Sequence, residues 1–314
     1  MKKEKTMTKY IILSSSLLLI TYFFSAWWND ELKIVFCDVG QGDATLLSQG
    51  STQLLVDAGP NDAVLDCLEK NMPFWDKKIE FFVLTHMDRD HIYGAPQVLD
   101  TFAVDYLFIN PSNKKTSDFN LLEEAISRKG DFSTRVVQTF IGQQIGFSNS
   151  IVTKVVSPDI FFPQVEGQNY ISSETTLSDE NSYFLHEKLT KNNENDLSIA
   201  LFVQFKDIIV FLPGDLESGG ELALLKSGLL KQVSVLKAGH HGSKSSSTPG
   251  FVEVLQPEIT TISSGKNNAY NHPNPQVIDI LTRFGSNIYQ TQTSGQLVFT
   301  ADGHKFWQTG VSGI

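Results

Sequence analysis

The segment from His86 to His91, with the sequence HMDRDH, places two imidazoles and two carboxylates within six residues. It follows the apolar run Phe81 to Leu84, which predicts a buried strand. A turn that only returned the chain to solvent would not need such side chains. Imidazoles and carboxylates are the usual protein ligands of divalent ions in hydrolytic sites. The segment therefore predicts a metal centre at a strand end.

Two other apolar runs end in similar side chains. IIVFLPG leads to Asp215, and VSVLKAG leads to His240 and His241. If these strand ends lie together, the carboxylates and imidazoles share one pocket, where their desolvation and repulsion are costly without a cation. The set is large enough for two divalent ions that share one oxygen ligand. Its members are His86, Asp88, Asp90, His91, Asp215, His240 and His241.

Each of these groups also has a structural interpretation. Asp88 with Arg89 is compatible with an ion-paired turn, and Asp215 with a cap of the helix that follows it. An isolated histidine is more often a hydrogen-bonded structural residue than a ligand, and we interpret His186 and His304 in that way. The recurrence of the pattern at three strand ends favours the metal centre.

Short apolar runs alternate with helical patterns along most of the chain, which predicts an α/β architecture of two sheets with helices outside. Strands are predicted at 32–40, 53–59, 79–85, 104–111, 133–140, 150–158, 197–205, 207–215, 233–243, 258–265, 287–292 and 295–303. Helices are predicted at 63–72, 95–102, 119–130, 218–230, 248–257 and 274–285. Residues 161–196 are polar and weakly periodic, and we expect an inserted surface loop with a short helix at 183–189.

HMDRDH resembles the H-x-H-x-D-H signature of the metallo-β-lactamase superfamily, with Asp88 where the second histidine usually stands. Four further segments are similar to the metallohydrolase domain of ComEC-type DNA-uptake channel proteins: FCDVGQGDATLL, LPGDLE, LKAGHHGSKSSS and YNHPNPQVI. The similarity extends over about residues 32–303, apart from the inserted loop. It implies an αββα sandwich with the site at the edge of its two sheets.

The resemblance also implies a ligand set for two divalent ions, Zn²⁺ or Mn²⁺. His86 and Asp88 would hold the first ion, Asp90 and His91 the second, and Asp215 would bridge them. His240 would complete the ligands of the second ion with His241 beside it, and the order of these two histidines stays open. Because Asp88 replaces a histidine, we expect the first site to be harder and to tolerate Mn²⁺ or Mg²⁺ better, relative to Zn²⁺, than a histidine site would.

Two further motifs are implied to support these ligands. Asp57 in LLVDAG matches an aspartate that orients the ligands. The histidine that the superfamily carries between HMDRDH and Asp215 is missing, and the N-x-x-S motif from Asn195 to Ser198 occupies that region. We therefore expect the first ion to be held less tightly, or to be completed by water.

The implied reaction is metal-assisted hydrolysis, in which a hydroxide between the two ions attacks the substrate. His241 and His272 are candidates for protonating the leaving group, and Ser243 and Lys244 are candidates for contacting a phosphate. A turn residue is the structural alternative for His272. We expect a phosphodiesterase, with DNA as the substrate implied by the resemblance.

Two other functions remain open. One is a cell-envelope hydrolase of a small phosphodiester, such as a choline phosphate ester, or of a lactone. The other is a non-catalytic DNA-uptake module that partners a separate channel protein. Residues 30–314 carry 21 basic and 34 acidic residues, a net charge near −13, which argues against a passive nucleic-acid-binding module. Bound divalent ions would reverse the field locally, so a phosphodiester substrate is not excluded.

The first 29 residues differ from the rest. Four lysines precede an apolar run from Tyr10 to Trp28, which is long enough to cross a bilayer. No small-x-small cleavage site follows it, which favours an uncleaved anchor over a cleaved signal. Because the lysine excess predicts a cytoplasmic N-terminus, we expect a single-pass membrane protein with residues 30–314 as the hydrolase domain on the outer face.

The chain has only two cysteines, Cys37 and Cys67, so neither a disulfide framework nor a cysteine-based zinc site is available. A single bridge in an oxidising compartment and two buried free thiols are both compatible with the sequence.

Overall fold

The computed structural model describes residues 14–15, 30–110, 116–129, 134–148, 150–158 and 194–311. The predicted anchor at residues 1–29, apart from Ser14 and Ser15, and residues 161–193 of the predicted insertion lie outside these described residues. Within the described part of the chain, no helix has the length and apolar character needed to span a membrane.

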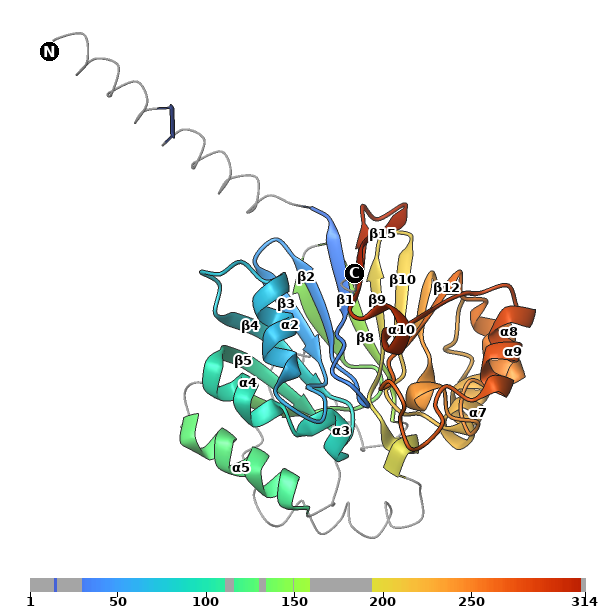
Figure 1. The fold of residues 1–314 in the computed structure, drawn as a ribbon, viewed down its shortest axis with the longest axis horizontal. Coiled ribbons are helices and arrows are strands. Elements are labelled where there is room, and N and C mark those ends of the chain that lie inside the picture. Colours follow the sequence, from blue (N-terminus) through green and yellow to red (C-terminus); the bar gives the residue numbers. More distant parts are fainter. Residues whose placement is uncertain are drawn as a thin grey trace, which may run out of the picture.

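The described residues form two β-sheets that pack face to face, with helices on both outer sides (Figure 1). The first sheet has eight strands in the order β15-β14-β1-β2-β3-β4-β5-β6. The strands from β3 to β6 run parallel, and the other neighbours pair antiparallel. Their bounds are β1 Leu32–Phe36, β2 Thr45–Gln49, β3 Thr52–Val56, β4 Lys78–Leu84, β5 Ala103–Ile109, β6 Arg135–Gln138, β14 Leu297–Ala301 and β15 Phe306–Val311.

The second sheet has seven strands in the order β13-β12-β11-β10-β9-β8-β7. The strands from β10 to β13 run parallel, whereas those from β7 to β10 alternate in direction. Their bounds are β7 Gln144–Ser148, β8 Ile151–Ser157, β9 Ala200–Phe205, β10 Ile208–Leu212, β11 Val235–Lys237, β12 Ile259–Ile262 and β13 Asn287–Gln290.

Among the described residues, three helices cover the outer face of each sheet. The helices α2 Ala63–Asn71, α4 Ala95–Thr101 and α5 Ser117–Lys129 lie on the first sheet, and α7 Ser218–Ser227, α8 Pro249–Leu255 and α9 Pro275–Arg283 lie on the second (Figure 1). Shorter elements are α3 Arg89–Ile92, α10 Thr291–Ser294 and the 3-10 helices η1 Glu194–Leu197 and η2 Gly239–Gly242.

Three apolar layers hold this arrangement together. Ile34 and Phe36 of β1 point into the layer between the sheets, whereas Val35 points into the layer beneath the helices of the first sheet. Successive side chains of a strand point to opposite faces, so a strand buried on both faces needs the unbroken apolar runs seen in the sequence. The third layer lies between the second sheet and its helices. The predicted αββα architecture is confirmed.

The structure also contains three strands that the sequence did not predict, namely β2, β7 and β15. The first strand also ends at Phe36, earlier than the predicted Gly40. β2 carries the sequence TLLSQ, which does not alternate in polarity, whereas β7 has the alternating sequence QIGFS but is only five residues long and contains a glycine. These strands are defined by pairing with neighbours: β2 lies between β1 and β3, and β15 pairs with β14.

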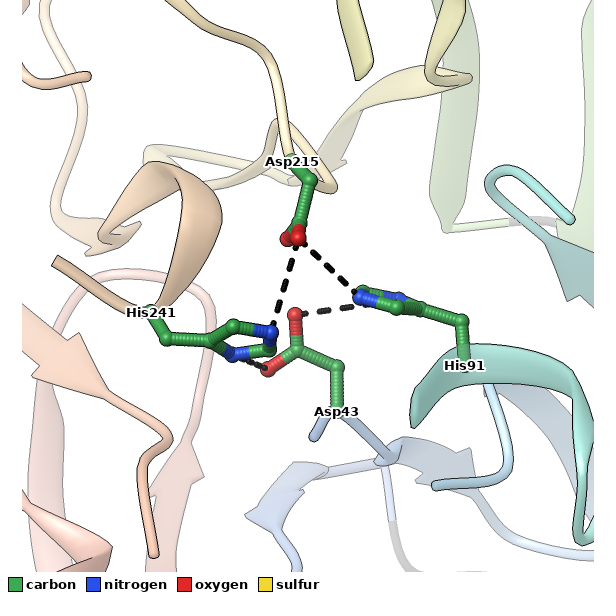
Figure 2. A group of neighbouring side chains, drawn as sticks. All are labelled: Asp43, His91, Asp215 and His241. Atoms are coloured by element: carbon green, nitrogen blue, oxygen red, sulfur yellow. Dashed lines mark ion pairs between the residues drawn. The ribbon is translucent and has the colours of Figure 1, made fainter. Parts of the chain in front are cut away.

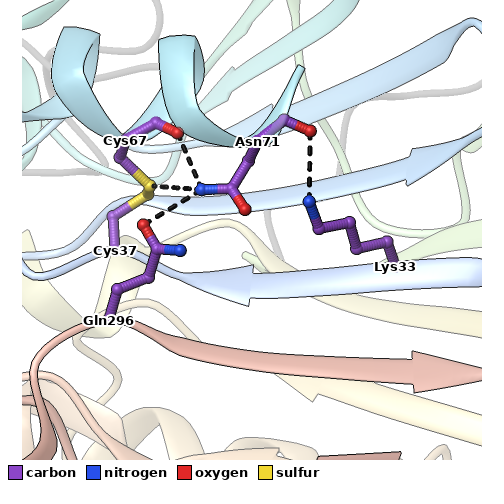
Figure 3. The surroundings of a disulfide bond; sticks show 5 residues. All are labelled: Lys33, Cys37, Cys67, Asn71 and Gln296. Atoms are coloured by element: carbon purple, nitrogen blue, oxygen red, sulfur yellow. Dashed lines mark hydrogen bonds between the residues drawn. A yellow bond between two sulfur atoms is a disulfide. The ribbon is translucent and has the colours of Figure 1, made fainter. Parts of the chain in front are cut away.

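Of the two cysteine states that the sequence left open, the structure has the disulfide (Figure 3). Cys37 follows β1 and Cys67 lies in α2, with their Cα atoms 5.8 Å apart. The Cys37 amide also donates to the Ala44 carbonyl at 2.9 Å, which closes the loop that carries Asp43. The bridge therefore ties the base of this loop to a helix of the first layer.

Reduction of this bridge should destabilise the chain. It closes a loop with a sequence separation of 30 residues. Chain-entropy arguments give about 3–4 kcal/mol for a loop of that length. We expect the urea midpoint of the full-length chain to fall when dithiothreitol is added under conditions that expose the buried bridge. The double variant Cys37→Ala/Cys67→Ala is the control, and its midpoint should not respond to dithiothreitol. Equal midpoints of the oxidised and reduced parent chain would contradict the prediction.

Candidate metal centre

Four strand ends from the two sheets deliver the predicted side chains to one place. Asp57 follows β3, the segment from His86 to His91 follows β4, Asp215 follows β10, and the pair His240–His241 lies in η2 after β11. Because neighbouring parallel strands end at the same sheet edge, their carboxyl ends form one rim, where α/β proteins place their sites. Figure 2 shows His91, Asp215 and His241 converging there from three separate segments.

The centre of this group is one oxygen of Asp215, a residue that is 2% exposed. Asp215 Oδ2 lies 3.3 Å from His91 Nε2 and 3.4 Å from His241 Nε2. It also lies 3.8 Å from His240 Nε2 and 4.0 Å from His86 Nε2. Four imidazole nitrogens thus surround a single carboxylate oxygen.

Two further carboxylates lie close to these imidazoles. Asp90 Oδ2 lies 3.2 Å from His241 Nε2, whereas Asp88 Oδ2 lies 4.0 Å from His86 Nε2. Around a tetrahedral ion with bonds of 2.0–2.1 Å, ligand atoms are about 3.3 Å apart. The spacings at His91, His241, Asp90 and Asp215 match that value, and those at His86 and Asp88 are wider.

The ring nitrogens show whether these residues fit a metal ion. Nε2 of His86 and Nε2 of His91 are buried and have no hydrogen-bond partner. The opposite nitrogens are engaged: His91 Nδ1 lies 2.8 Å from Asp57 Oδ2, and His86 Nδ1 lies 3.2 Å from Thr85 Oγ1. A buried polar atom without a partner is costly. These two nitrogens make no hydrogen bond and face the same Asp215 oxygen, an arrangement that fits a divalent cation.

Asp57 lies directly behind His91. The Asp57 carboxylate also accepts two hydrogen bonds from Thr85, one from the backbone amide and one from Oγ1, and each is 2.8 Å long. The backbone of Asp57 is left-handed, with φ of 62°, a conformation that aspartate tolerates better than most residues. These contacts fix the orientation of the His91 ring.

The N-x-x-S motif lies behind the other side of the centre. Ser198 Oγ accepts a hydrogen bond from the Asp215 amide at 3.2 Å. Asn195 Nδ2 donates to Glu217 Oε1 at 3.3 Å, and the same oxygen lies 2.8 Å from His240 Nδ1. The motif therefore helps to fix Asp215 directly, through Ser198, and His240 indirectly, through Asn195 and Glu217.

The remaining candidate residues lie on the rim or elsewhere. His272 is half-buried, with its ring centroid 5.6 Å from that of His240 and 6.3 Å from that of His241. Ser243 is buried and its Oγ lies 2.9 Å from Ser245 Oγ, whereas Lys244 is exposed. His304 is an exposed residue paired with Asp207, and His186 lies outside the described residues.

Three residues of this region were missed by the sequence analysis: Asp43, Lys237 and Glu217. Lys237 is buried, and its Nζ contacts an Asp43 oxygen and lies 3.7 Å from Asp215 Oδ1. A lysine inside the apolar run VSVLKAG was the available signal, because buried lysines need a partner. Asp43 ends the DVGQGD motif, which contributed to the resemblance but was not interpreted as part of the site.

Asp43 is close enough to count as a ligand candidate. One ligand atom from each of Asp43, His91, Asp215 and His241 lies within 4.8 Å of the others (Figure 2). The Asp43 oxygens, however, lie 3.6 Å from His241 Nδ1 and 4.0 Å from His91 Nδ1, on the side opposite to Nε2. Because Lys237 already neutralises Asp43, we assign it a supporting role and regard Asp90 as the carboxylate on the Nε2 side.

The charges in the metal-free centre stabilise one another. Burial alone would raise the pKa of the Asp215 carboxyl, but His241 and His91 hold it well below its usual range. Burial alone would lower the pKa of His241, but Asp215 and Asp43 raise it to about 10. The pKa of His91 is likewise raised, because the negative charges of Asp215 and Asp57 outweigh the lowering effect of burial. Without an ion, the centre is thus a network of ion pairs.

Two histidines behave in the opposite way. Burial, reinforced by the charge on His91, lowers the pKa of His86 to about 4. Burial, reinforced by the charges on His241 and His240, lowers the pKa of His272 to about 4. Both rings are therefore neutral at pH 7.

Metal binding should release protons, since a ligating imidazole must be neutral. The raised pKa of His241 stabilises the metal-free chain fully below its ordinary value of 6.5, and this stabilisation is lost as the pH rises toward 10. The same proton competes with an ion, so Mn²⁺ affinity should increase with pH, about tenfold per unit for each proton displaced. Calorimetric titration between pH 6.5 and 8.5 in buffers of different ionisation enthalpy measures this release. His241→Ala should release fewer protons, and an affinity independent of pH would contradict the expectation.

Lys237 should matter most when no ion is bound. Lys237→Met leaves the buried Asp43 carboxylate without its main partner. Breaking a buried ion pair costs about 3–5 kcal/mol, so we expect the unfolding free energy of the metal-free chain to fall by about that amount. The double variant Asp43→Asn/Lys237→Met removes both charges and should recover most of the loss in a urea titration. The exposed Lys305→Met is the matched control, and a Lys237→Met chain as stable as this control would contradict the pairing.

The arrangement of the two sheets identifies the fold. The metallo-β-lactamase fold protein YhfI from Bacillus subtilis superposes with a TM-score of 0.52 at 12% sequence identity, covering 87% of this chain and 100% of that one. This likeness and the two helix-covered sheets show that the chain has the metallo-β-lactamase fold. No protein-family model matches the chain.

The relatives found among curated proteins include a competence protein. ComE operon protein 3 of Bacillus subtilis is 27% identical over 290 residues, which cover 86% of this chain and 33% of that protein. Recombination protein 2 of Haemophilus influenzae is 25% identical over 297 residues, covering 91% of this chain and 30% of that protein. Competence protein ComA of Neisseria gonorrhoeae is 36% identical over 118 residues. The resemblance seen in the motifs is confirmed, and the chain spans about a third of the length of the first two relatives.

Proposed function

We propose that this chain is a binuclear metal-dependent phosphodiesterase that hydrolyses DNA. The observation that carries the proposal is the single Asp215 oxygen surrounded by Nε2 atoms of His86, His91, His240 and His241. An oxygen in that position suits a ligand shared by two ions. Divalent ions bound there would act as Lewis acids and lower the pKa of a water molecule.

The residues of the chain have three tasks in this proposal. Asp57 and Ser198 hold His91 and Asp215 in place through the hydrogen bonds described above. Asp88 and Asp90 are about one-third exposed, which leaves that side of the centre open to a substrate. His272 stands at the rim with a buried Nδ1 that lacks a hydrogen-bond partner, and its neutral ring would contact a substrate oxygen or the leaving group.

DNA is proposed as the substrate because the chain is similar to ComE operon protein 3 and Competence protein ComA. The carboxylate of Asp88 in a position usually held by histidine favours Mn²⁺ or Mg²⁺. The acidic character of the chain, with a net charge of −10, opposes the approach of a long polyanion. The bound ions would therefore have to provide the local attraction. A small phosphodiester is the alternative that this charge favours.

The proposed location is the outer face of the cytoplasmic membrane, with residues 1–29 as a single-pass anchor. The disulfide supports a location in an oxidising compartment, where such bridges persist. A separate channel protein is a proposed partner, because the motifs of the chain resemble those of the hydrolase domain of ComEC-type DNA-uptake channel proteins.

The test is hydrolysis by the full-length chain of labelled single- and double-stranded DNA with Mn²⁺. We expect cleavage that a chelator abolishes and that Asp215→Asn reduces below detection, because this change removes the shared anionic ligand. Asp207→Asn is the matched control, since Asp207 is exposed and paired with His304; this variant should cleave like the parent.

Parallel assays distinguish the other functions. Hydrolysis of bis-(p-nitrophenyl) phosphate or of a lactone without DNA cleavage would replace DNA by a small substrate. A chain that binds no metal and cleaves none of these substrates would favour a non-catalytic module and would overturn the proposal.

A further inference from the structure

We infer that the adjacent histidines His240 and His241 serve different metal ions. His241 belongs to the ion held by Asp90 and His91, whereas His240 belongs to the ion held by His86 and Asp88. There, His240 supplies an imidazole that no described residue between HMDRDH and Asp215 provides. The inference rests on the proposed binuclear site, and it departs from the expectation that both histidines lie at the second ion.

The surroundings of His241 place it at the second ion. Its ring is buried, and Nδ1 lies 3.0 Å from the Ser263 carbonyl oxygen. This contact leaves Nε2 to face Asp90 Oδ2 at 3.2 Å and Asp215 Oδ2 at 3.4 Å. The ring centroid of His91 lies 5.4 Å away. Every ligand near His241 Nε2 thus belongs to the second ion or is shared.

His240 has a different environment. Its Nδ1 lies 2.8 Å from Glu217 Oε1, and Asn195 Nδ2 donates to the same oxygen at 3.3 Å. Its Nε2 faces Asp215 Oδ2 at 3.8 Å. A carboxylate on one ring nitrogen and an ion on the other is a common arrangement for metal-binding histidines, because it fixes the ring and its tautomer. Glu217 is therefore a positioning residue for His240.

The first ion lacks a ligand that His240 can supply. His86 Nε2 lies 4.0 Å from both Asp88 Oδ2 and Asp215 Oδ2. These residues provide one imidazole and two carboxylates. In the described part of the chain, no histidine occurs between His91 and His240. His240 brings a second imidazole to the same Asp215 oxygen and makes four protein ligands.

The backbone explains how neighbouring residues can diverge. His240 and His241 both have left-handed conformations, with φ of 44° and 54°, between Gly239 and Gly242. Their ring planes are 68° apart and their centroids are separated by 6.0 Å. Two consecutive non-glycine residues in this conformation are strained, and such strain is typical of functional sites. Hydrogen bonds from the Ser243 amide to the His240 carbonyl and from Ser246 Oγ to the Gly239 carbonyl hold the turn.

The experiment measures Mn²⁺ binding by the full-length chain. Metal analysis gives the stoichiometry, calorimetry gives the two dissociation constants, and electron paramagnetic resonance detects coupling between two ions. We expect two coupled ions in the parent chain. His240→Ala should keep one tightly bound ion and lose the coupling, whereas His241→Ala should weaken the tight ion.

Two further variants separate ligation from folding. Glu217→Gln should retain the fold by circular dichroism but weaken only the first ion, by about 10–100-fold, as expected for a residue that orients a ligand. His304→Ala removes an exposed histidine that is paired with Asp207, and it should bind two ions like the parent.

Two outcomes would overturn the inference: His240→Ala binds two coupled ions with unchanged affinity, or His240→Ala and His241→Ala weaken the same ion. A parent chain that binds a single ion would also overturn it. The result is independent of the substrate. If the stoichiometries follow the expectation but no phosphodiester is cleaved, the proposed function fails and the assignment of His240 stands. If the parent cleaves DNA and His240→Ala keeps both ions, only the assignment fails.

Discussion

The arrangement of the centre depends on the attraction between the Asp215 carboxylate and the positive charges that surround it. One oxygen of Asp215 faces four imidazoles, and the other faces Lys237. A buried carboxylate in so confined a space is stable only when cations compensate it. Protonated histidines and Lys237 do so in the metal-free chain, and divalent ions would replace the protons. The same geometry therefore serves both states.

The candidate centre draws its residues from both sheets. The first sheet provides the segment from His86 to His91 after β4, and the second provides Asp215 after β10 and the histidine pair after β11. The apolar layer between the sheets packs these strands together, so the positions of the candidate ligands depend on packing at a distance from the centre. The disulfide extends this rigidity to the loop that carries Asp43.

Lys237 and Glu217 show how the supporting residues differ in kind. Lys237 neutralises Asp43 and lies against the far oxygen of Asp215, which leaves Oδ2 directed toward the histidines. Glu217 engages the Nδ1 atom of His240 and leaves its Nε2 directed toward the same oxygen. Lys237 therefore compensates negative charge, whereas Glu217 orients the ring of His240.

The sequence by itself determined the class of fold and most of the centre. Buried parallel strands require continuous apolar runs, and ionisable residues directly after such runs have few interpretations other than a site, as HMDRDH illustrates. Only the tertiary structure decided the roles of Asp43 and Lys237, because a carboxylate in a glycine-rich loop and a lysine in a strand become partners through long-range packing. The tertiary structure also decided in which directions the side chains of His240 and His241 point. These directions depend on the left-handed backbone angles of the two residues, which the order of residues in the sequence does not reveal. Whether Cys37 and Cys67 form a disulfide likewise depends on the tertiary structure, which brings the end of β1 next to α2.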